Sequence, residues 1–244
     1  MLIRNNIALV LCGHGSSFKF YKQDFKKNHK IIEKNIHTSC YFCFIEKNEP
    51  NIENCLRAIK KKGIEKIFFF PFLLFNGGHF EKDIKAKIKE LSQSLKLKIK
   101  LIDKISLTKE VMPIIEKKIS KTLKKNKTNI LVTFCSASKS PKVSSELRTY
   151  TEKLAKNLNI DKAYSYFVSE ETEFMKEIKS IKNKNYFLIV HPIFLFKGYL
   201  QNKNLNFFNK LESKNYHVIN TLMAINGIRG LIIKKLKRIF HITN

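Results

Sequence analysis

Short apolar segments alternate with longer, lysine-rich amphipathic segments along the 244 residues of the chain. The apolar segments have strand length, and the amphipathic ones carry apolar residues at helical spacing. This alternation predicts an α/β fold of parallel sheets with right-handed crossovers and helices on both faces. We expect strands near 7–12, 39–46, 66–73, 97–103, 129–135, 163–168, 186–193 and 217–222, and helices over 18–36, 51–62, 80–95, 108–124, 141–158, 171–182, 201–214 and 227–239. The uninterrupted apolar strands IFFFPF and YFLIV are typical of sheets covered on both faces.

The chain repeats itself at a nearly constant offset. LVLCGHGSS (9–17) aligns with LVTFCSASK (131–139), CFIE (43–46) with YFVS (166–169), and PFLLFNGGH (71–79) with PIFLFKGYL (192–200). Such a repeat indicates a duplicated structural unit. We therefore predict two similar doubly wound halves, 1–124 and 125–244, with the polar stretch KKNKTN (124–129) at their boundary.

Composition limits the class of protein. A content of 43% hydrophobic and 27% charged residues indicates a globular chain and excludes a disordered tail, a collagen and a disulfide scaffold. The longest apolar runs are too short to cross a bilayer. Five cysteines, an odd number, and no apparent signal peptide favour a reducing, cytoplasmic location without a membrane partner.

The net charge of +27 resembles the signature of a nucleic-acid-binding protein. However, the basic residues are 42 Lys and only 5 Arg, and Asn, Ile and Phe are also frequent, as an AT-rich genome would produce. Arginine is the better reader of phosphates and bases. We therefore expect no nucleic-acid partner, and an anionic small molecule would account for the charge as well as DNA would.

Three polar side chains follow predicted strands of the first half. His14 lies in Gly-His-Gly-Ser-Ser after the first strand, Glu46 follows the second, and His79 opens the helix after the third. Ligands of parallel sheets bind beyond the carboxyl ends of the strands. Neutral imidazole suits iron, cobalt, nickel or zinc, and a nearby carboxylate balances charge. These residues are therefore candidate ligands of a divalent metal.

The repeat supplies an internal control for this site. Ser136, Ser169 and Leu200 occupy the positions that match His14, Glu46 and His79, whereas scaffold residues such as Pro71/Pro192 and Gly77/Gly198 persist. A structural requirement would tend to operate in both halves. The loss of all three coordinating groups together therefore favours a functional site in the first half alone.

Three motifs resemble the signatures of the class II sirohydrochlorin chelatases in their long, internally duplicated form. They are LVLCGHGSS, FIE with the following EP, and FPFLLFNGGHFEKDI. The resemblance implies two chelatase-like halves that face each other across a cleft. It makes His14 a metal ligand and the proton acceptor, His79 the second metal ligand, and Glu46 a metal or substrate contact. The substrate-binding residues would be Ser16, Glu46, Leu74, Phe75, Asn76, Gly77, Gly78, His79 and, from the second half, Lys197.

The reaction implied is insertion of Co²⁺ or Fe²⁺ into sirohydrochlorin, an anionic tetrapyrrole, with no cofactor beyond the metal that is consumed. Since no Walker or GxGxxG pattern occurs, no nucleotide is expected. Gly77 and Gly78 would admit a flat ring, with Phe72, Leu74 and Phe75 as an apolar floor. Phe196, Lys197 and Gly198 would make the second half a lid. The physiological metal and the pathway stay open, and two halves in one chain favour a monomer.

Three alternative functions make different demands on the sequence. A histidine phosphatase would need an arginine beside His14, where Gly13 stands. A non-catalytic carrier of a tetrapyrrole or metal stays open, and strongly salt-dependent binding to DNA would revive a nucleic-acid module.

Other cysteines and histidines are candidates for structural or surface roles. Cys40 and Cys43 have the spacing of a metal or redox motif, but they share one predicted strand and are expected to be structural. His29 and His37 are expected at the surface. A substrate contact by His191, at a strand end, is left open.

Overall fold

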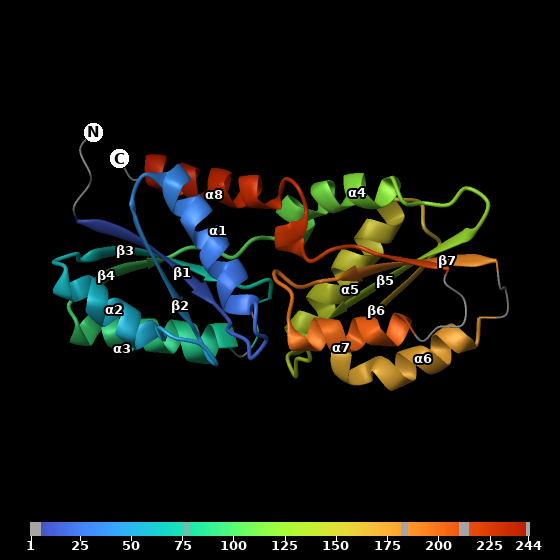
Figure 1. The fold of residues 1–244 in the computed structure, drawn as a ribbon, viewed down its shortest axis with the longest axis horizontal. Coiled ribbons are helices and arrows are strands. Elements are labelled where there is room, and N and C mark those ends of the chain that lie inside the picture. The colour runs from blue at the N-terminus through green and yellow to red at the C-terminus, as the bar shows by residue number, and fades with distance from the viewer. Residues whose placement is uncertain (1–5, 76, 78, 182–184, 210–214, 243–244) are drawn as a thin grey trace. The chain divides into compact units, whose positions relative to one another are not determined.

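The structure, a computed structural model, describes residues 6–75, 77, 79–181, 185–209 and 215–242. Within them the chain forms two four-stranded parallel sheets with flanking helices, as the alternating pattern predicted (Figure 1). The strand orders are β2-β1-β3-β4 and β6-β5-β7-β8, so both halves have the same topology. The strands are β1 (Ile7–Gly13), β2 (Ser39–Phe44), β3 (Lys66–Phe72), β4 (Lys98–Leu101), β5 (Thr128–Cys135), β6 (Lys162–Phe167), β7 (Tyr186–Pro192) and β8 (Tyr216–Val218).

A helix follows each strand, and its ends differ from the predicted ones by a few residues. The π-helical segment η1 (His79–Lys85) continues as α3, and the π-helical segment η2 (Leu107–Val111) continues as α4. The short 3₁₀ segments η3 (Val168–Glu170) and η4 (Leu222–Ala224) precede α6 and α8. The α-helices are α1 (Tyr21–Ile36), α2 (Ile52–Lys61), α3 (Ala86–Ser94), α4 (Met112–Ser120), α5 (Pro141–Asn157), α6 (Glu171–Lys179), α7 (Tyr199–Phe208) and α8 (Ile228–Ile242).

The first sheet is covered on both faces. In Figure 1, α2 and α3 lie on one face of this sheet, and α1 and α8 lie on the other. The α2/α3 face buries residues such as Val10, Leu56 and Phe69. On the other face, Phe25 of α1 packs against Phe44 and Phe72 of the sheet. A strand buried on both sides cannot alternate polar and apolar residues, which explains the continuous apolar run of β3.

Contacts divide the chain into two compact units that cross the sequence repeat. The first unit comprises 1–105 and 229–244, and the second comprises 106–228. Helix α8 returns to the first sheet, where the Phe240 ring lies 4.8 Å from the Phe68 ring and Arg229 donates to the Asn28 side chain at 2.8 Å. Helix α4 groups with the second sheet. The halves 1–124 and 125–244 therefore remain a prediction about the duplicated sequence. The boundaries of the compact units differ from them because α4 and α8 each pack on the sheet of the other half.

The second sheet is covered in the same manner. Phe134 of β5, Phe174 of α6 and Phe208 of α7 belong to one buried cluster, and α4 lies beside α5 on the other face (Figure 1). All five cysteines of the chain are free and buried. Burial beside the thiols of Cys12 and Cys55 raises the pKa of Cys43 well above its usual value, which suits a core residue. No helix in the described part of the chain is long and apolar enough to cross a membrane.

The surface position expected for His29 is wrong. Its side chain is buried, and its Nε2 lies 3.0 Å from the Cys40 carbonyl oxygen. Burial lowers the pKa of His29, which favours the neutral ring. His37 is exposed at the end of α1, as expected.

Candidate functional site

The backbone brings His14 and Glu46 side by side at the carboxyl edge of the first sheet. Gly13, the last residue of β1, pairs with Phe44 of β2 and Phe72 of β3. Beyond the strands, the Ile45 N–H donates to the Gly13 carbonyl and the Glu46 N–H donates to the His14 carbonyl, both at 3.0 Å. These bonds extend the ladder by two residues and fix the two side chains on adjacent strand ends.

The side chains of His14 and Glu46 approach each other. His14 Nδ1 lies 3.6 Å from Glu46 Oε1 and 3.2 Å from the Gly15 carbonyl oxygen. Both side chains are about 40% exposed, at 39% and 42%. A ring nitrogen that faces a carboxylate and a carbonyl is held as the N–H donor, so the lone pair of the neutral ring resides on Nε2. This is the tautomer that a metal-binding histidine needs.

The two glycines around His14 are required for packing of the loop. Gly15 has a φ of +96°, and a Cβ there would lie 1.7 Å from the Glu46 carbonyl oxygen. At Gly13, a Cβ would lie 2.7 Å from the Phe25 ring. The glycines therefore let the loop dock on its neighbours, in addition to the open approach that the sequence suggested.

Three further side chains hold this loop. The Gly15 N–H donates to the Tyr21 hydroxyl at 3.3 Å, and the Ser16 N–H donates to Asn48 Oδ1 at 2.8 Å. The Phe18 N–H donates to Ser16 Oγ at 3.1 Å, so the hydroxyl predicted to bind substrate already serves the turn. Burial raises the pKa of Tyr21 to about 12, which keeps its hydroxyl protonated. Tyr21 and Asn48 were not predicted from the sequence, because neither belongs to the strand-end pattern.

The exit of β3 places the next group of predicted residues at the same edge. Leu74 is buried, and its carbonyl accepts a hydrogen bond from Lys104 at 2.8 Å. Phe75 and Gly77 are half-buried, and His79 begins η1. Asn76 and Gly78, and the side chain of His79, lie outside the described residues. Phe72 is not part of an exposed floor, because it is buried with its ring 5.5 Å from the Phe25 ring.

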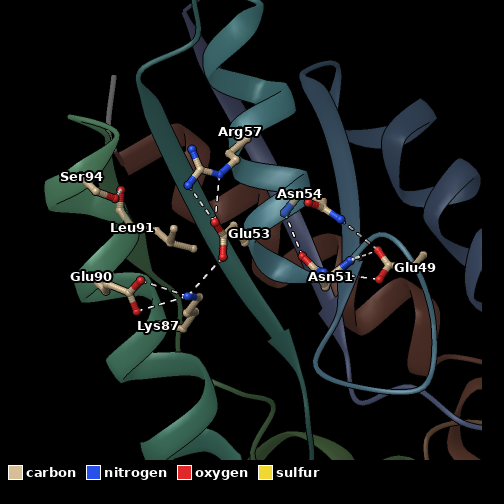
Figure 2. Close-up of polar contacts among 9 residues, drawn as sticks. All are labelled: Glu49, Asn51, Glu53, Asn54, Arg57, Lys87, Glu90, Leu91 and Ser94. Carbon is tan, nitrogen blue, oxygen red and sulfur yellow. Dashed lines mark hydrogen bonds and ion pairs between the residues drawn. The ribbon is translucent and has the colours of Figure 1, made fainter.

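A groove of about 550 Å³ borders Glu46 on the side of α2 and α3. Lys87, which lines this groove, is held by Glu53 at 3.3 Å and by Glu90 at 3.0 Å (Figure 2). Hydrogen bonds from Arg57 and Lys87 lower the pKa of Glu53, so it stays charged. The groove is therefore a locally acidic surface on a basic protein. Its lining residues are Ile45, Glu46, Asn51, Ile52, Glu53, Asp83, Ala86, Lys87 and Glu90.

The carboxyl edge of the second sheet differs in chemistry. Ser136, Ser169 and Leu200 are all exposed there, and Lys197 is exposed as well. His191, whose role was left open, is fully buried, and its Nε2 lies 3.1 Å from the Tyr150 hydroxyl. Burial lowers the pKa of His191 to about 3. A direct substrate contact by His191 is therefore excluded in this conformation.

Coordination by the described side chains alone is incomplete. No three His, Cys, Asp or Glu side chains among them are grouped so that they could hold a metal ion. The described pair of His14 and Glu46 supplies one imidazole and one carboxylate. A third ligand would have to come from the substrate, from solvent or from His79, whose side chain is not described.

Comparisons with known proteins identify the family of the chain. The CbiX family model matches residues 8–122. A sirohydrochlorin cobaltochelatase of Sulfolobus acidocaldarius is 31% identical over 124 residues, covering 48% of this chain and 93% of the relative.

Two solved structures are similar over nearly the whole chain. SirB from Bacillus subtilis with Fe³⁺ has a TM-score of 0.79 at 19% identity and covers 96% of this chain and 95% of that one. The sirohydrochlorin chelatase SirB of B. subtilis subspecies spizizenii with cobalt has a TM-score of 0.74 at 18% identity, with 96% and 94% covered. These likenesses show that both units share the fold of these structures. Because a relative of 31% identity is matched over nearly its full length and the match spans His14, Glu46 and His79, the chain belongs to the CbiX family of class II sirohydrochlorin chelatases.

Proposed function

We propose that the protein inserts a divalent metal, Co²⁺ or Fe²⁺, into sirohydrochlorin at the carboxyl edge of the first sheet. The observation that carries the proposal is the orientation of His14, with Nδ1 held between Glu46 Oε1 at 3.6 Å and the Gly15 carbonyl at 3.2 Å. The relative from S. acidocaldarius, a sirohydrochlorin cobaltochelatase by name, supports this substrate and cobalt.

The proposed metal ligand is Nε2 of His14. A hydrogen bond from Nδ1 to the Gly15 carbonyl fixes the ring, and the nearby Glu46 carboxylate increases the basicity of Nε2. Imidazole nitrogen is a suitable donor for both Co²⁺ and Fe²⁺. His79 is proposed as the second ligand, since its helix begins at the same edge of the sheet. Glu46 would then act mainly through His14, by balancing the charge of the bound ion.

Metal insertion also requires proton transfer. The macrocycle binds M²⁺ and releases two pyrrole N–H protons, so the net charge is conserved. Nε2 of His14 cannot hold the metal and a proton at once, so its two roles are sequential. Transfer of the ion to the ring nitrogens frees the lone pair, which then accepts one pyrrole proton, while the second pyrrole proton passes to solvent water. Glu46, 3.6 Å from Nδ1, stabilises the imidazolium until the proton passes to water.

The substrate contacts follow from the same edge. Phe75 and Gly77, both half-buried, are proposed to line the macrocycle, together with Asn76 and Gly78 outside the described residues. Leu74 has a buried side chain and is proposed to support this loop. Ser16 is proposed to contribute through its position in the loop, because its hydroxyl serves the turn. Lys197 of the second unit is exposed and is proposed to attract a substrate carboxylate.

The experiment is anaerobic incubation of the protein with sirohydrochlorin and Co²⁺ or Fe²⁺, followed by the absorbance change of the macrocycle. Chelation faster than the uncatalysed rate, with multiple turnovers, is the expected result. Tight binding of the macrocycle without turnover for either metal would contradict the proposal and favour a non-catalytic carrier.

A further inference from the structure

Exposed apolar side chains are concentrated at the carboxyl edges of the sheets. Of the large apolar side chains that the structure describes, three are exposed: Phe20, Tyr199 and Leu200. Phe20 is 50% exposed and lies in the first unit, six residues after His14 in the same loop. Phe20 is therefore an exposed apolar ring close to the candidate site.

Local stability does not explain a phenylalanine at position 20. Phe20 is the N-cap residue of α1 and makes no side-chain capping hydrogen bond. Ser, Thr, Asp and Asn are the residues preferred at the N-cap of a helix. A sequence that breaks a local rule without structural gain indicates a functional position.

The surroundings of Phe20 combine an apolar face with positive charge. The ring of Phe18 lies 5.8 Å from the Phe20 ring in an edge-to-face arrangement. The Lys19 ammonium lies 5.7 Å from the centre of the Phe20 ring. The loop is also held in place, because the Tyr21 hydroxyl returns to the Gly15 N–H at 3.3 Å. A rigid ring with an adjacent cation suits a flat ligand that carries carboxylates.

We propose that Phe20 is the stacking platform for one face of the macrocycle and that Lys19 binds one of its carboxylates. This proposal rests on the proposed function and identifies residues that recognise its substrate. Carboxylates of the macrocycle would be repelled by the acidic groove on the α2/α3 side of Glu46, which contains Glu53, Asp83 and Glu90. The loop of Phe18, Lys19 and Phe20 offers the opposite charge and an apolar ring on the same edge.

The test measures binding of metal-free sirohydrochlorin by absorbance titration, separately from Co²⁺ binding. Phe20→Ser should raise the macrocycle Kd about tenfold, since both the stacking of the aromatic ring and the apolar area that it buries are lost. Phe20→Trp should bind at least as tightly as wild type, and Phe20→Leu should fall between wild type and Phe20→Ser. The KM for sirohydrochlorin should rise with Kd, while Co²⁺ affinity stays unchanged. The melting temperature of Phe20→Ser should be nearly unchanged, because the ring is half-exposed and its removal leaves no core cavity.

A charge pair supplies the matched control. Lys19→Glu should weaken macrocycle binding severalfold and reduce its salt dependence. Lys27→Glu makes the same change in charge two turns along α1 at another exposed lysine and should have little effect.

Three outcomes would overturn the inference. If Phe20→Ser binds the macrocycle with the wild-type Kd while the wild type binds and turns over, the role of Phe20 is wrong and the proposed function stands. Absence of any macrocycle binding by the wild type would overturn the proposed function as well. Self-association of the wild type that Phe20→Ser abolishes, without a change in macrocycle Kd, would assign the ring to a contact between two copies of the chain.

Discussion

The carboxyl edges of the two sheets share a scaffold and differ in chemistry. Both edges follow the same strand order, and His14 and Glu46 of the first edge, like Ser136, Ser169 and Leu200 of the second, are exposed or half-exposed. In the first unit, Gly15 with its φ of +96° docks the His14 loop on the Glu46 backbone. In the second, Ala137 stands at the matching position and is not among the residues of positive φ. The first edge thus has both a specialised loop and coordinating side chains, and the second has neither.

This difference separates residues that a fold needs from residues that a reaction needs. Strand order and the apolar strands were retained in both units, because each sheet must be buried on two faces. The histidine, the glutamate and the glycine of positive φ that follows the histidine occur in one unit only. A serine hydroxyl is a poor neutral ligand beside imidazole, and the Leu200 side chain has no lone pair. We therefore expect chemistry at the first edge alone.

The largest effect is expected for His14→Ala. Loss of the proposed ligand and proton acceptor should reduce metal insertion at saturating metal by about 100-fold or more. The fold should be unaffected, because His14 is partly exposed and its removal leaves no core cavity. Ser136→Ala, at the matching position of the second sheet, is the control and should keep wild-type turnover. Equal losses in both variants would show that the two edges are not functionally distinct.

A large effect on stability is expected for Gly15→Ala. The added methyl would overlap the Glu46 carbonyl at 1.7 Å and force an alanine to a φ of +96°. We expect a loss of about 2 kcal/mol or more in the free energy of unfolding, measured by denaturant titration. Gly63→Ala is the matched control, because Gly63 also has positive φ, +76°, but nothing lies within 4 Å of its added Cβ. A smaller loss in Gly15→Ala than in Gly63→Ala would refute the docking role.

Glu46→Gln should have an intermediate effect on activity. The amide keeps the shape of the side chain but removes the charge that faces His14 Nδ1, so turnover should fall by about 10- to 100-fold. Stability should change by less than about 0.5 kcal/mol, because the side chain is 42% exposed. Steady-state kinetics at saturating metal tests this, with Ser169→Ala of the second unit as the control. Unchanged turnover in Glu46→Gln would remove Glu46 from the site.

Substitution of His191 should have the smallest effect on activity and a measurable effect on the pH dependence of stability. Its pKa is lowered to about 3 by burial, against about 6.5 in the unfolded chain, so the neutral ring stabilises the fold fully above pH 6.5. As pH falls towards 3, the unfolded state gains a proton first and this stability is lost. Between pH 7.5 and pH 5 the loss should be about 2 kcal/mol.

His191→Gln should lack this component of the pH dependence while keeping near-normal turnover at pH 7.5. Denaturant titrations of both proteins at the two pH values provide the measurement. Parallel pH profiles in the two proteins would show that His191 is protonated equally in the folded and unfolded states.

The periodicity of the sequence predicts the helices and strands, but it does not predict which sheet each helix packs on. The strands and helices described occur where the alternation placed them, with β8 shortened to Tyr216–Val218. Helix α8 was expected in the second half, yet it packs on the first sheet through Phe240. An amphipathic pattern shows that a helix has one apolar face, and it does not show which of two similar sheets that face covers.

The histidines illustrate the same limit at the level of side chains. His29 was expected at the surface because its helix is rich in lysine, although Phe25, His29 and Ile32 follow the spacing of a buried stripe. His191 belongs to a fully buried strand, and that continuous apolar run was the available signal. His14 and Glu46 were predicted to share one edge because both follow strands of a parallel sheet, and the adjacency of β1 and β2 that brings the two side chains together comes from the structure. The roles of Tyr21 and Asn48 depend on loop geometry, which spacing does not encode.

The most direct test of the central claim is the stoichiometry of metal binding. Titration of the wild-type protein with Co²⁺ under anaerobic conditions should give one high-affinity site per chain. That site should be lost in the double variant His14→Ala/His79→Ala and retained in Ser136→Ala. Two equivalent sites per chain, or a site that survives in the double variant, would contradict a chelatase with chemistry at one edge only.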